Sequence, residues 1–251
     1  MCRHLAYLGP PILLADLLFA PPHSLSRQSW APGDMRGGGT INADGFGVGW
    51  FDGPPEPIRY RRSCPLWSDA GLPALAAATR SGAILAAVRS ATEGMPVTET
   101  AAAPFGEGRW LFSHNGRVAG WPDSVTVAAG TLPVRDLLTL DAPTDSALLW
   151  ALTRARLRAG EPPGAALAAV VAQVAAAAPG SRLNLLLTDG ESIAATACGH
   201  SLSVRAAPGE SVLVASEPLG PDPGWIPVPD RSLLVATPQT ATITALEGAA
   251  S

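Results

Sequence analysis

The residue with the most distinctive potential chemistry is Cys2, which directly follows the initiator methionine. Processing that removes Met1 would leave a thiol and a free α-amine on one residue. An α-amine has an ordinary pKa of about 7.7–8.0, so a useful fraction is neutral near pH 7 and can accept the thiol proton. Cys2 is therefore a candidate N-terminal nucleophile that carries its own general base. A structural role is also open, because cysteine is common in protein cores.

Two charged residues could bind a substrate beside such a nucleophile. Arg89 follows an apolar strand predicted over 84–88, where a guanidinium can bind a carboxylate with two parallel hydrogen bonds. A solvated arginine at a strand exit fits the same pattern. Asp145 falls in the first turn of a helix predicted over 145–158, with Thr144 as its N-cap. Its carboxylate can hold a substrate ammonium or can simply offset the helix dipole.

Asn115-Gly116 follows a strand predicted over 110–112. Asn-Gly is the preferred pair for a type I′ hairpin turn, and the sequence favours that reading. The Asn115 side-chain amide and the Gly116 backbone N–H could also form an oxyanion hole, in which loss of one donor typically costs about 10²–10³ in rate. Both roles are compatible, since a turn can present donors.

Other motifs argue against a cofactor or a metal. The glycine-rich run from Asn42 to Trp50 lacks the G-x-G-x-x-G spacing of a dinucleotide site and precedes a strand, so its glycines are expected to allow close backbone packing beneath a site. The four histidines have no metal-ligand spacing, and we expect structural roles for them. They are His4, His23, His114 and His200.

Composition excludes several classes of protein. The chain has 251 residues and no lysine, which rules out Schiff-base and P-loop lysine chemistry. A net charge of −4 argues against nucleic acid as a partner. Three widely spaced cysteines give no disulfide framework, so a reducing, cytoplasmic compartment is expected. No segment is long enough for a transmembrane helix, and Pro10, Pro11 and Asp16 interrupt a signal-peptide pattern.

The pattern of elements predicts sheets and helices packed in layers. A strand over 2–8 is followed by a helix over 12–19 with Pro11 at its start, and then by a loop over 20–45 that ends in Gly37-Gly38-Gly39. Helices are expected over 71–80, 145–158 and 163–177, and a loop over 218–229. Strands are expected over 46–51, 58–62, 84–88, 110–112, 183–188, 192–197, 202–205, 211–215, 233–237 and 241–245.

Five segments together resemble the class II glutamine amidotransferases. In order, these are Cys2-Arg3-His4-Leu5, Asp44 to Trp50, Arg89-x-x-Thr92-x-Gly94, His114-Asn115-Gly116 and Thr144-Asp145-Ser146. The family consists of N-terminal-nucleophile hydrolases with a four-layer αββα fold. The resemblance therefore implies an α+β protein, with one domain over residues 2–251. A freestanding γ-glutamyl hydrolase of this family is resembled more closely by segments 1–9, 24–32, 37–50, 216–219 and 222–225.

The resemblance also implies a role for each matching residue. Cys2 would attack a γ-glutamyl amide, with Asn115 and Gly116 as the oxyanion hole. Arg89 and Thr92 would bind the α-carboxylate, and Asp145 the α-ammonium. Many relatives carry histidine where this chain has Glu93, which leaves the wall around the leaving group undefined. No metal or other cofactor is implied, and no nucleic acid, membrane or partner protein.

Three other readings remain open at this point. A glutaminase would use the same residues to pass ammonia to a separate synthetase. A binding protein would keep the fold without catalysis and could retain Met1. A secreted protein would have a mature N-terminus near residue 21 instead of at Cys2.

Overall fold

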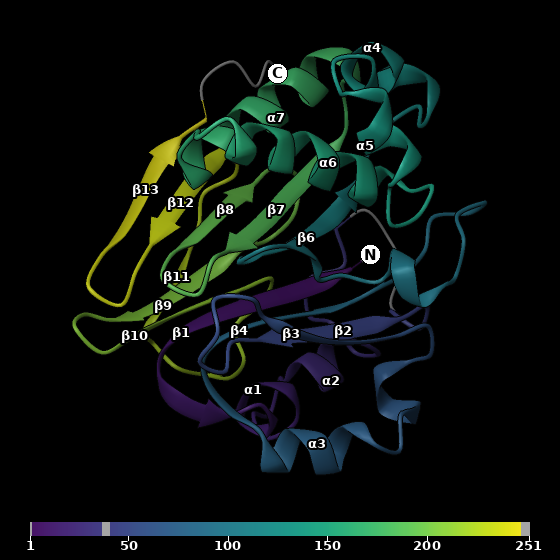
Figure 1. Ribbon diagram of the computed structural model, residues 1–251. Coiled ribbons are helices and arrows are strands. Elements are labelled where there is room, and N and C mark those ends of the chain that lie inside the picture. Colours follow the sequence, from purple (N-terminus) through teal and green to yellow (C-terminus); the bar gives the residue numbers. More distant parts are fainter. Residues whose placement is uncertain (1, 37–40, 247–251) are drawn as a thin grey trace.

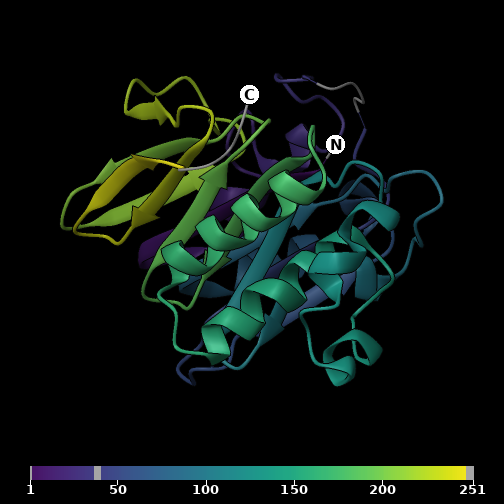
Figure 2. The same cartoon turned by 90° about the horizontal axis from the view of Figure 1, so that it is seen from above.

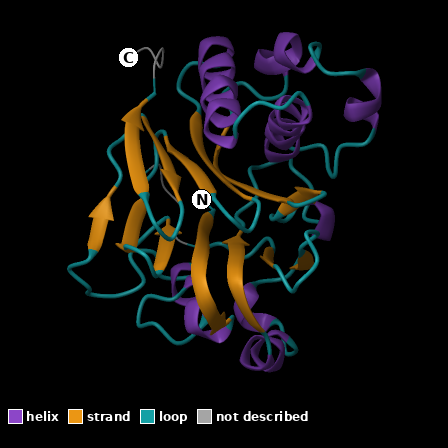
Figure 3. Ribbon diagram, turned by 60° about the vertical axis from the view of Figure 1, so that its left-hand side comes forward, coloured by secondary structure: helices purple, strands orange, loops and turns teal. Residues whose placement is uncertain are grey.

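The chain forms two antiparallel sheets that pack face to face, with helices over both outer faces (Figures 1 and 3). The computed structural model describes residues 2–36 and 41–246. Met1, whose removal we expect, and Gly37-Gly38-Gly39, at the end of the expected loop, lie outside the described residues. This arrangement of layers confirms the expected αββα architecture.

The first sheet has the strand order β11-β9-β10-β1-β4-β2-β3, and the second has β13-β12-β8-β7-β6-β5. The strands of the first sheet are β1 (Arg3–Leu13), β2 (Phe46–Trp50), β3 (Ile58–Arg62), β4 (Arg80–Val88), β9 (Ser203–Ala207), β10 (Ser211–Ala215) and β11 (Trp225–Pro227). Those of the second are β5 (Phe105–Glu107), β6 (Trp110–Arg117), β7 (Arg182–Thr188), β8 (Ile193–Ala197), β12 (Ser232–Ala236) and β13 (Ala241–Ala245).

Helices form the two outer layers. On the first sheet lie α1 (Ala15–Leu18), α2 (Leu25–Gln28) and α3 (Leu72–Ala78) (Figure 1). Over the second sheet are α4 (Thr126–Ala129), α5 (Val134–Leu138), α6 (Asp145–Arg158) and α7 (Pro163–Ala177), with α6 and α7 side by side on the sheet (Figure 2). Single 3-10 turns are formed by η1 (Leu66–Ser68), η2 (Glu99–Ala101) and η3 (Asp123–Val125).

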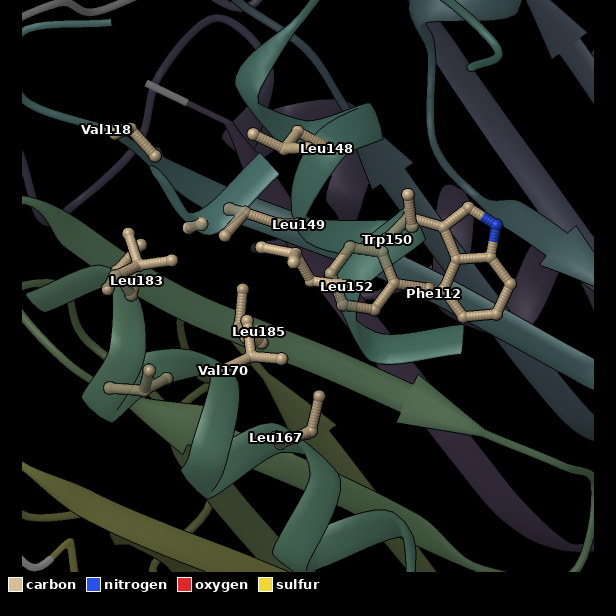
Figure 4. Packing of buried hydrophobic residues seen from close by; sticks show 14 of the residues in the cluster. Phe112, Val118, Leu148, Leu149, Trp150, Leu152, Leu167, Val170, Leu183 and Leu185 are labelled. Atoms are coloured by element: carbon tan, nitrogen blue, oxygen red, sulfur yellow. The ribbon is translucent and has the colours of Figure 1, made fainter. Parts of the chain in front are cut away.

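Side-chain alternation along the strands divides the core into three layers. In β1, Leu5 and Tyr7 pack toward α1 and α3, whereas Ala6 and Leu8 face the second sheet. The third layer lies between the second sheet and its helices, where Phe112 of β6 stacks on Trp150 of α6 with ring centroids 5.4 Å apart (Figure 4). Central strands such as β4 and β7 are therefore buried on both faces, which is why their sequences are largely hydrophobic.

Helices α6 and α7 have the predicted bounds, 145–158 and 163–177. The Thr144 hydroxyl accepts a hydrogen bond from the backbone N–H of Ala147 at 3.2 Å, which confirms the predicted N-cap. The Pro162-Pro163 pair sets the start of α7, because proline is well tolerated in the first turn of a helix.

The expected helix over 12–19 was wrong at its start. Strand β1 continues to Leu13, and only Ala15–Leu18 are helical. Pairing with β4 shifts register between Leu8 and Ile12, and Ile12 then pairs with Ser81. The two prolines fall in this irregular stretch, where a strand tolerates the missing backbone N–H. Cross-strand pairing therefore outweighs the local helix signal.

The hairpin prediction for Asn115-Gly116 was also wrong. Both residues lie inside β6, where they pair with Asn184 and Leu183 of β7. Two expected loops contain short elements as well: α2 lies within 20–45, and β11 lies within 218–229. These elements form through contacts with distant strands, which a local pattern does not record.

The glycine-rich run allows the close packing that the sequence predicts. A Cβ atom at Gly47 would overlap the carbonyl oxygen of Ala103, and one at Gly49 would lie 2.6 Å from a methyl group of Leu111. The loop before β5 and strand β6 thus rest directly on β2. This close approach brings β6 and the loop before β5 against the first sheet, next to the candidate site.

Candidate active site

Strand β1 lies between β4 and β10, so the start of the chain has a different neighbour on each side. Leu5 pairs with Ala86 of β4 and with Ala215 of β10. Because both pairings are antiparallel, the residues just before β1 lie beside the residues that follow β4 and β10. Cys2 is therefore flanked by segment 89–92 on one side and by segment 216–217 on the other.

Cys2 and Arg89 line one small cavity of about 20 Å³. The Cys2 thiol is partly exposed and lies 3.8 Å from the carbonyl oxygen of Ser90. Ser113 and His114 of β6, together with Ser146 of α6, form the opposite wall. A thiol and a buried guanidinium from distant parts of the sequence thus share one space.

Backbone contacts hold Arg89 in place. Its N–H donates to Gly45 O at 2.7 Å, and its guanidinium Nη1 donates to Pro96 O at 2.9 Å. Asp44 joins the two loops, because its N–H donates to Arg89 O and its carboxylate accepts from the Ala91 N–H at 2.8 Å. Arg89 is 9% exposed, and its guanidinium keeps further N–H groups for a ligand.

Asp145 adjoins this space through Ser146. With Thr92 and Glu93 it lines a second cavity, of about 240 Å³. Its two carboxylate oxygens accept N–H hydrogen bonds from Val118 at 2.9 Å and from Ser146 at 2.7 Å. Each oxygen retains acceptor capacity, so this buried carboxylate is oriented and can still bind an ammonium group.

Asn115 and Gly116 lie next to the cavity wall on β6. The buried Asn115 amide donates to the Ser216 hydroxyl at 3.4 Å. A Cβ atom at position 116 would overlap the carbonyl oxygen of Arg182 and lie 2.7 Å from the His114 ring, so only glycine fits there. The oxyanion-hole role of these two residues stays a prediction.

The sequence patterns gave no role to three residues near Cys2, namely Arg3, Ser216 and Glu217. Arg3 is almost fully buried and donates from Nε to Glu217 at 2.6 Å and from Nη1 to the Cys2 carbonyl at 2.9 Å. Ser216 accepts the backbone N–H of His4 at 3.0 Å. The resemblance includes these positions without giving them a role, and only the pairing of β1 with β10 brings them together.

Glu217 is held as a carboxylate by its neighbours. Burial alone would raise its pKa. Hydrogen bonds from His23 and Gly33, together with the Arg3 guanidinium, outweigh that effect and lower the pKa below its ordinary value. His23 Nε2 lies 2.6 Å from Glu217, and the Gly33 N–H donates to it at 2.7 Å. One carboxylate thus joins the start of the chain to segment 23–33.

Two histidines near the site are buried in neutral form. Burial lowers the pKa of His4 to about 3, and the electrostatic effect of the nearby His114, His200 and Arg3 side chains lowers it further. Burial and the Arg182 guanidinium likewise lower the pKa of His200 to about 3. His4 Nδ1 lies 3.1 Å from the Ser113 hydroxyl, which links the two sheets beside Cys2.

Within residues 2–36 and 41–246, no group of three or more His, Cys, Asp or Glu side chains is arranged to hold a metal ion. Over the same residues, none of the helices combines the length and the apolar character needed to span a bilayer. All three cysteines are free thiols, in agreement with the lack of a disulfide pattern.

This fold, with a cysteine next to the first strand and an arginine and an aspartate around it, places the chain among the class II glutamine amidotransferases. The model of that family matches residues 20–237, and the chain belongs to the family. A solved structure described as a glutamine aminotransferase class-II domain protein, from Silicibacter pomeroyi, has the same fold, with a TM-score of 0.70, 27% identity and coverage of 98% of this chain and 99% of that one.

Within the family, the chain is similar to proteins with a more specific name. It is 44% identical to the γ-glutamyl-hercynylcysteine sulfoxide hydrolase of Mycolicibacterium smegmatis, over 93% of this chain and 95% of that protein. It is 42% identical to the protein of the same name from Mycobacterium tuberculosis, over 99% and 98% of the two chains. A probable glutamine amidotransferase of Saccharomyces cerevisiae is 28% identical over 96% of this chain and 83% of that protein.

The neutral histidines predict a specific dependence of stability on pH. Below pH 6.5 the unfolded chain takes up a proton at His4, whereas the folded chain does not until the pH nears 3. The free energy of unfolding should therefore fall as pH falls, by up to about 1.4 kcal/mol per pH unit for one proton. The free energy of unfolding, measured with urea between pH 7 and pH 5, should change less with pH for His4→Gln than for the unsubstituted chain. This holds even if the variant is less stable overall. Equal changes with pH would contradict neutral burial of His4.

Proposed function

We propose that this protein hydrolyses the γ-glutamyl amide bond of γ-glutamyl-hercynylcysteine sulfoxide, a step of ergothioneine biosynthesis, and releases glutamate and hercynylcysteine sulfoxide. The observation that carries the proposal is the 44% identity, over nearly the whole chain, to a hydrolase of that name. The shared cavity of Cys2 and Arg89, with Asp145 beside it, supports a γ-glutamyl substrate.

The glutamyl group carries an α-carboxylate and an α-ammonium on the same carbon. The Arg89 guanidinium and the Thr92 hydroxyl bind the carboxylate, and the Asp145 carboxylate binds the ammonium. Because the backbone contacts of Arg89 and Asp145 fix both charges before substrate arrives, little ordering is needed on binding. This grip presents the γ-carbonyl carbon to the Cys2 sulfur.

The reaction then has two stages. After Met1 is removed, the α-amine of Cys2 accepts the thiol proton and the thiolate attacks the γ-carbonyl carbon. The Asn115 amide and the Gly116 N–H stabilise the oxyanion of the tetrahedral intermediate. The C–N bond breaks, and the leaving amine takes the proton from the Cys2 ammonium. Water next attacks the thioester and gives a proton to the α-amine, and cleavage of the C–S bond releases glutamate and the thiol.

This chemistry requires neither a metal nor a partner protein. A reducing, cytoplasmic location would keep Cys2 as a thiol, and the free Cys64 and Cys198 thiols are in keeping with such a location. The alternative activity is a glutaminase that supplies ammonia to a partner synthetase. Membership of the glutamine amidotransferase family favours that alternative, and it would use the same glutamyl grip.

Substrate turnover separates these two activities. The kcat/KM for γ-glutamyl-hercynylcysteine sulfoxide should exceed the values for glutamine and glutathione, and intact-mass measurement of the active protein should show that Met1 is absent. A preference for glutamine would overturn the proposed substrate and favour the glutaminase. Full activity of protein that retains Met1 would contradict the use of the Cys2 amine as the base.

The role of Asp145 can be tested with a matched pair of substrates. Asp145→Asn should lower kcat/KM for a γ-glutamyl amide by about 10²-fold, the scale of one lost hydrogen-bonded charge pair. The corresponding glutaryl amide lacks the α-ammonium, so its slower hydrolysis should change little. An equal loss with both substrates would indicate that Asp145 only supports the structure through Val118 and Ser146.

A further inference from the structure

Another cavity lies on the opposite side of β1 from Arg89. It has a volume of about 590 Å³, within the usual range for small-molecule sites. Ser216 and Glu217, which follow β10, form its inner end. Ser216 accepts the His4 N–H, and Glu217 binds Arg3, so the cavity begins at the two residues that flank Cys2 on this side.

The geometry of an amide determines on which side of Cys2 the leaving group lies. An extended secondary amide is planar and trans, so its acyl chain and the substituent on its nitrogen point in opposite directions from the carbonyl carbon. The proposed glutamyl grip, Arg89 and Asp145, lies on the β4 side of Cys2. The group on the nitrogen must therefore extend toward β10, where the large cavity lies. Ammonia, the leaving group of glutamine, would need no such space.

Both signs of charge line this cavity. Glu217 is offset by Arg3 and His23. Asp34 and Arg36 form a second pair, with nitrogen and oxygen 2.6 Å apart, and Asp230 adds another carboxylate. Asp230 is oriented by the Gly199 N–H, which donates to its Oδ1 at 2.7 Å. A cavity with carboxylates and a guanidinium around one space suits a zwitterion better than a simple anion or cation.

The rest of the lining is mixed. Polar atoms come from His23, His200, Ser201 and Ser203, and apolar walls come from Pro22, Pro218, Pro221, Pro227 and Val228. Such walls suit the methyl groups of a quaternary ammonium, which carries its charge beneath an apolar surface and donates no hydrogen bond. The nearby His200 is neutral, because burial lowers its pKa to about 3, and so adds no positive charge that would repel a cation.

We propose that this cavity binds the leaving group of the amide, a zwitterionic amino acid with a quaternary ammonium, and that Asp230 faces the cationic end while Arg36 binds a carboxylate. The assignment rests on the proposed function and adds the residues that select the leaving group. Asp230 acts in specificity, since the glutamyl grip and the Cys2 chemistry lie on the other side of β1.

The test compares Asp230→Asn with the unsubstituted chain. Asparagine keeps the oxygen that accepts the Gly199 N–H and removes the charge. The kcat/KM for γ-glutamyl-hercynylcysteine sulfoxide should fall about tenfold, on the scale of one partly screened charge interaction. Inhibition by free glutamate, which has no leaving group, should be unchanged. Asp52→Asn, an exposed carboxylate beyond the far end of β2, makes the same change in net charge and should affect neither quantity.

The possible outcomes separate the two proposals. If the unsubstituted chain does not hydrolyse the sulfoxide substrate, the proposed function fails. If it does, and Asp230→Asn matches Asp52→Asn, the assignment of the cavity is wrong while the function stands. An Asp230→Asn variant that weakens glutamate inhibition as much as turnover would also overturn the assignment, because the effect would then reach the glutamyl side.

Discussion

A buried ion pair between Arg3 and Glu217 fixes the position of the first residues of the chain in this fold. The two side chains are 2% and 5% exposed, and their paired atoms lie 2.6 Å apart. Removing one partner of such a pair typically costs about 3–5 kcal/mol, because the other charge stays buried and unpaired. Since Arg3 also donates to the carbonyl of Cys2, and Glu217 also binds His23 and Gly33, the position of Cys2 depends on this carboxylate.

The placement of β1 between β4 and β10 then divides the surroundings of Cys2 into two halves. The β4 side leads to Arg89 and the carboxylate of Asp145, which suit the two charges of a glutamyl group. The β10 side leads to Ser216, Glu217 and the larger cavity. The strand that starts beside Cys2 therefore separates Arg89 and Asp145 from the larger cavity.

Much of this arrangement could be predicted from local sequence, and the rest depends on distant pairing. Helix α6 was predicted with its correct bounds because its N-cap, Thr144, is a local signal. Asn115-Gly116 was misread because pairing with β7 outweighs the turn preference of Asn-Gly. Arg89 and Asp145 were predicted as candidate substrate-binding residues from their positions at a strand end and a helix start, and both lie near Cys2 in the structure. Arg3 and Glu217 are 214 residues apart, and no local pattern predicts such a contact.

The central claim is that Cys2, freed of Met1, forms a γ-glutamyl thioester. The most direct measurement is mass spectrometry of enzyme that is acid-quenched during turnover of γ-glutamyl-hercynylcysteine sulfoxide. The account predicts one γ-glutamyl group on an N-terminal peptide that begins at Cys2, and its transfer to hydroxylamine when that nucleophile is added before quenching. Cys64→Ala should keep this adduct, and Cys2→Ala should lose both the adduct and turnover. Normal turnover by Cys2→Ala, or a γ-glutamyl group attached elsewhere, would contradict the account.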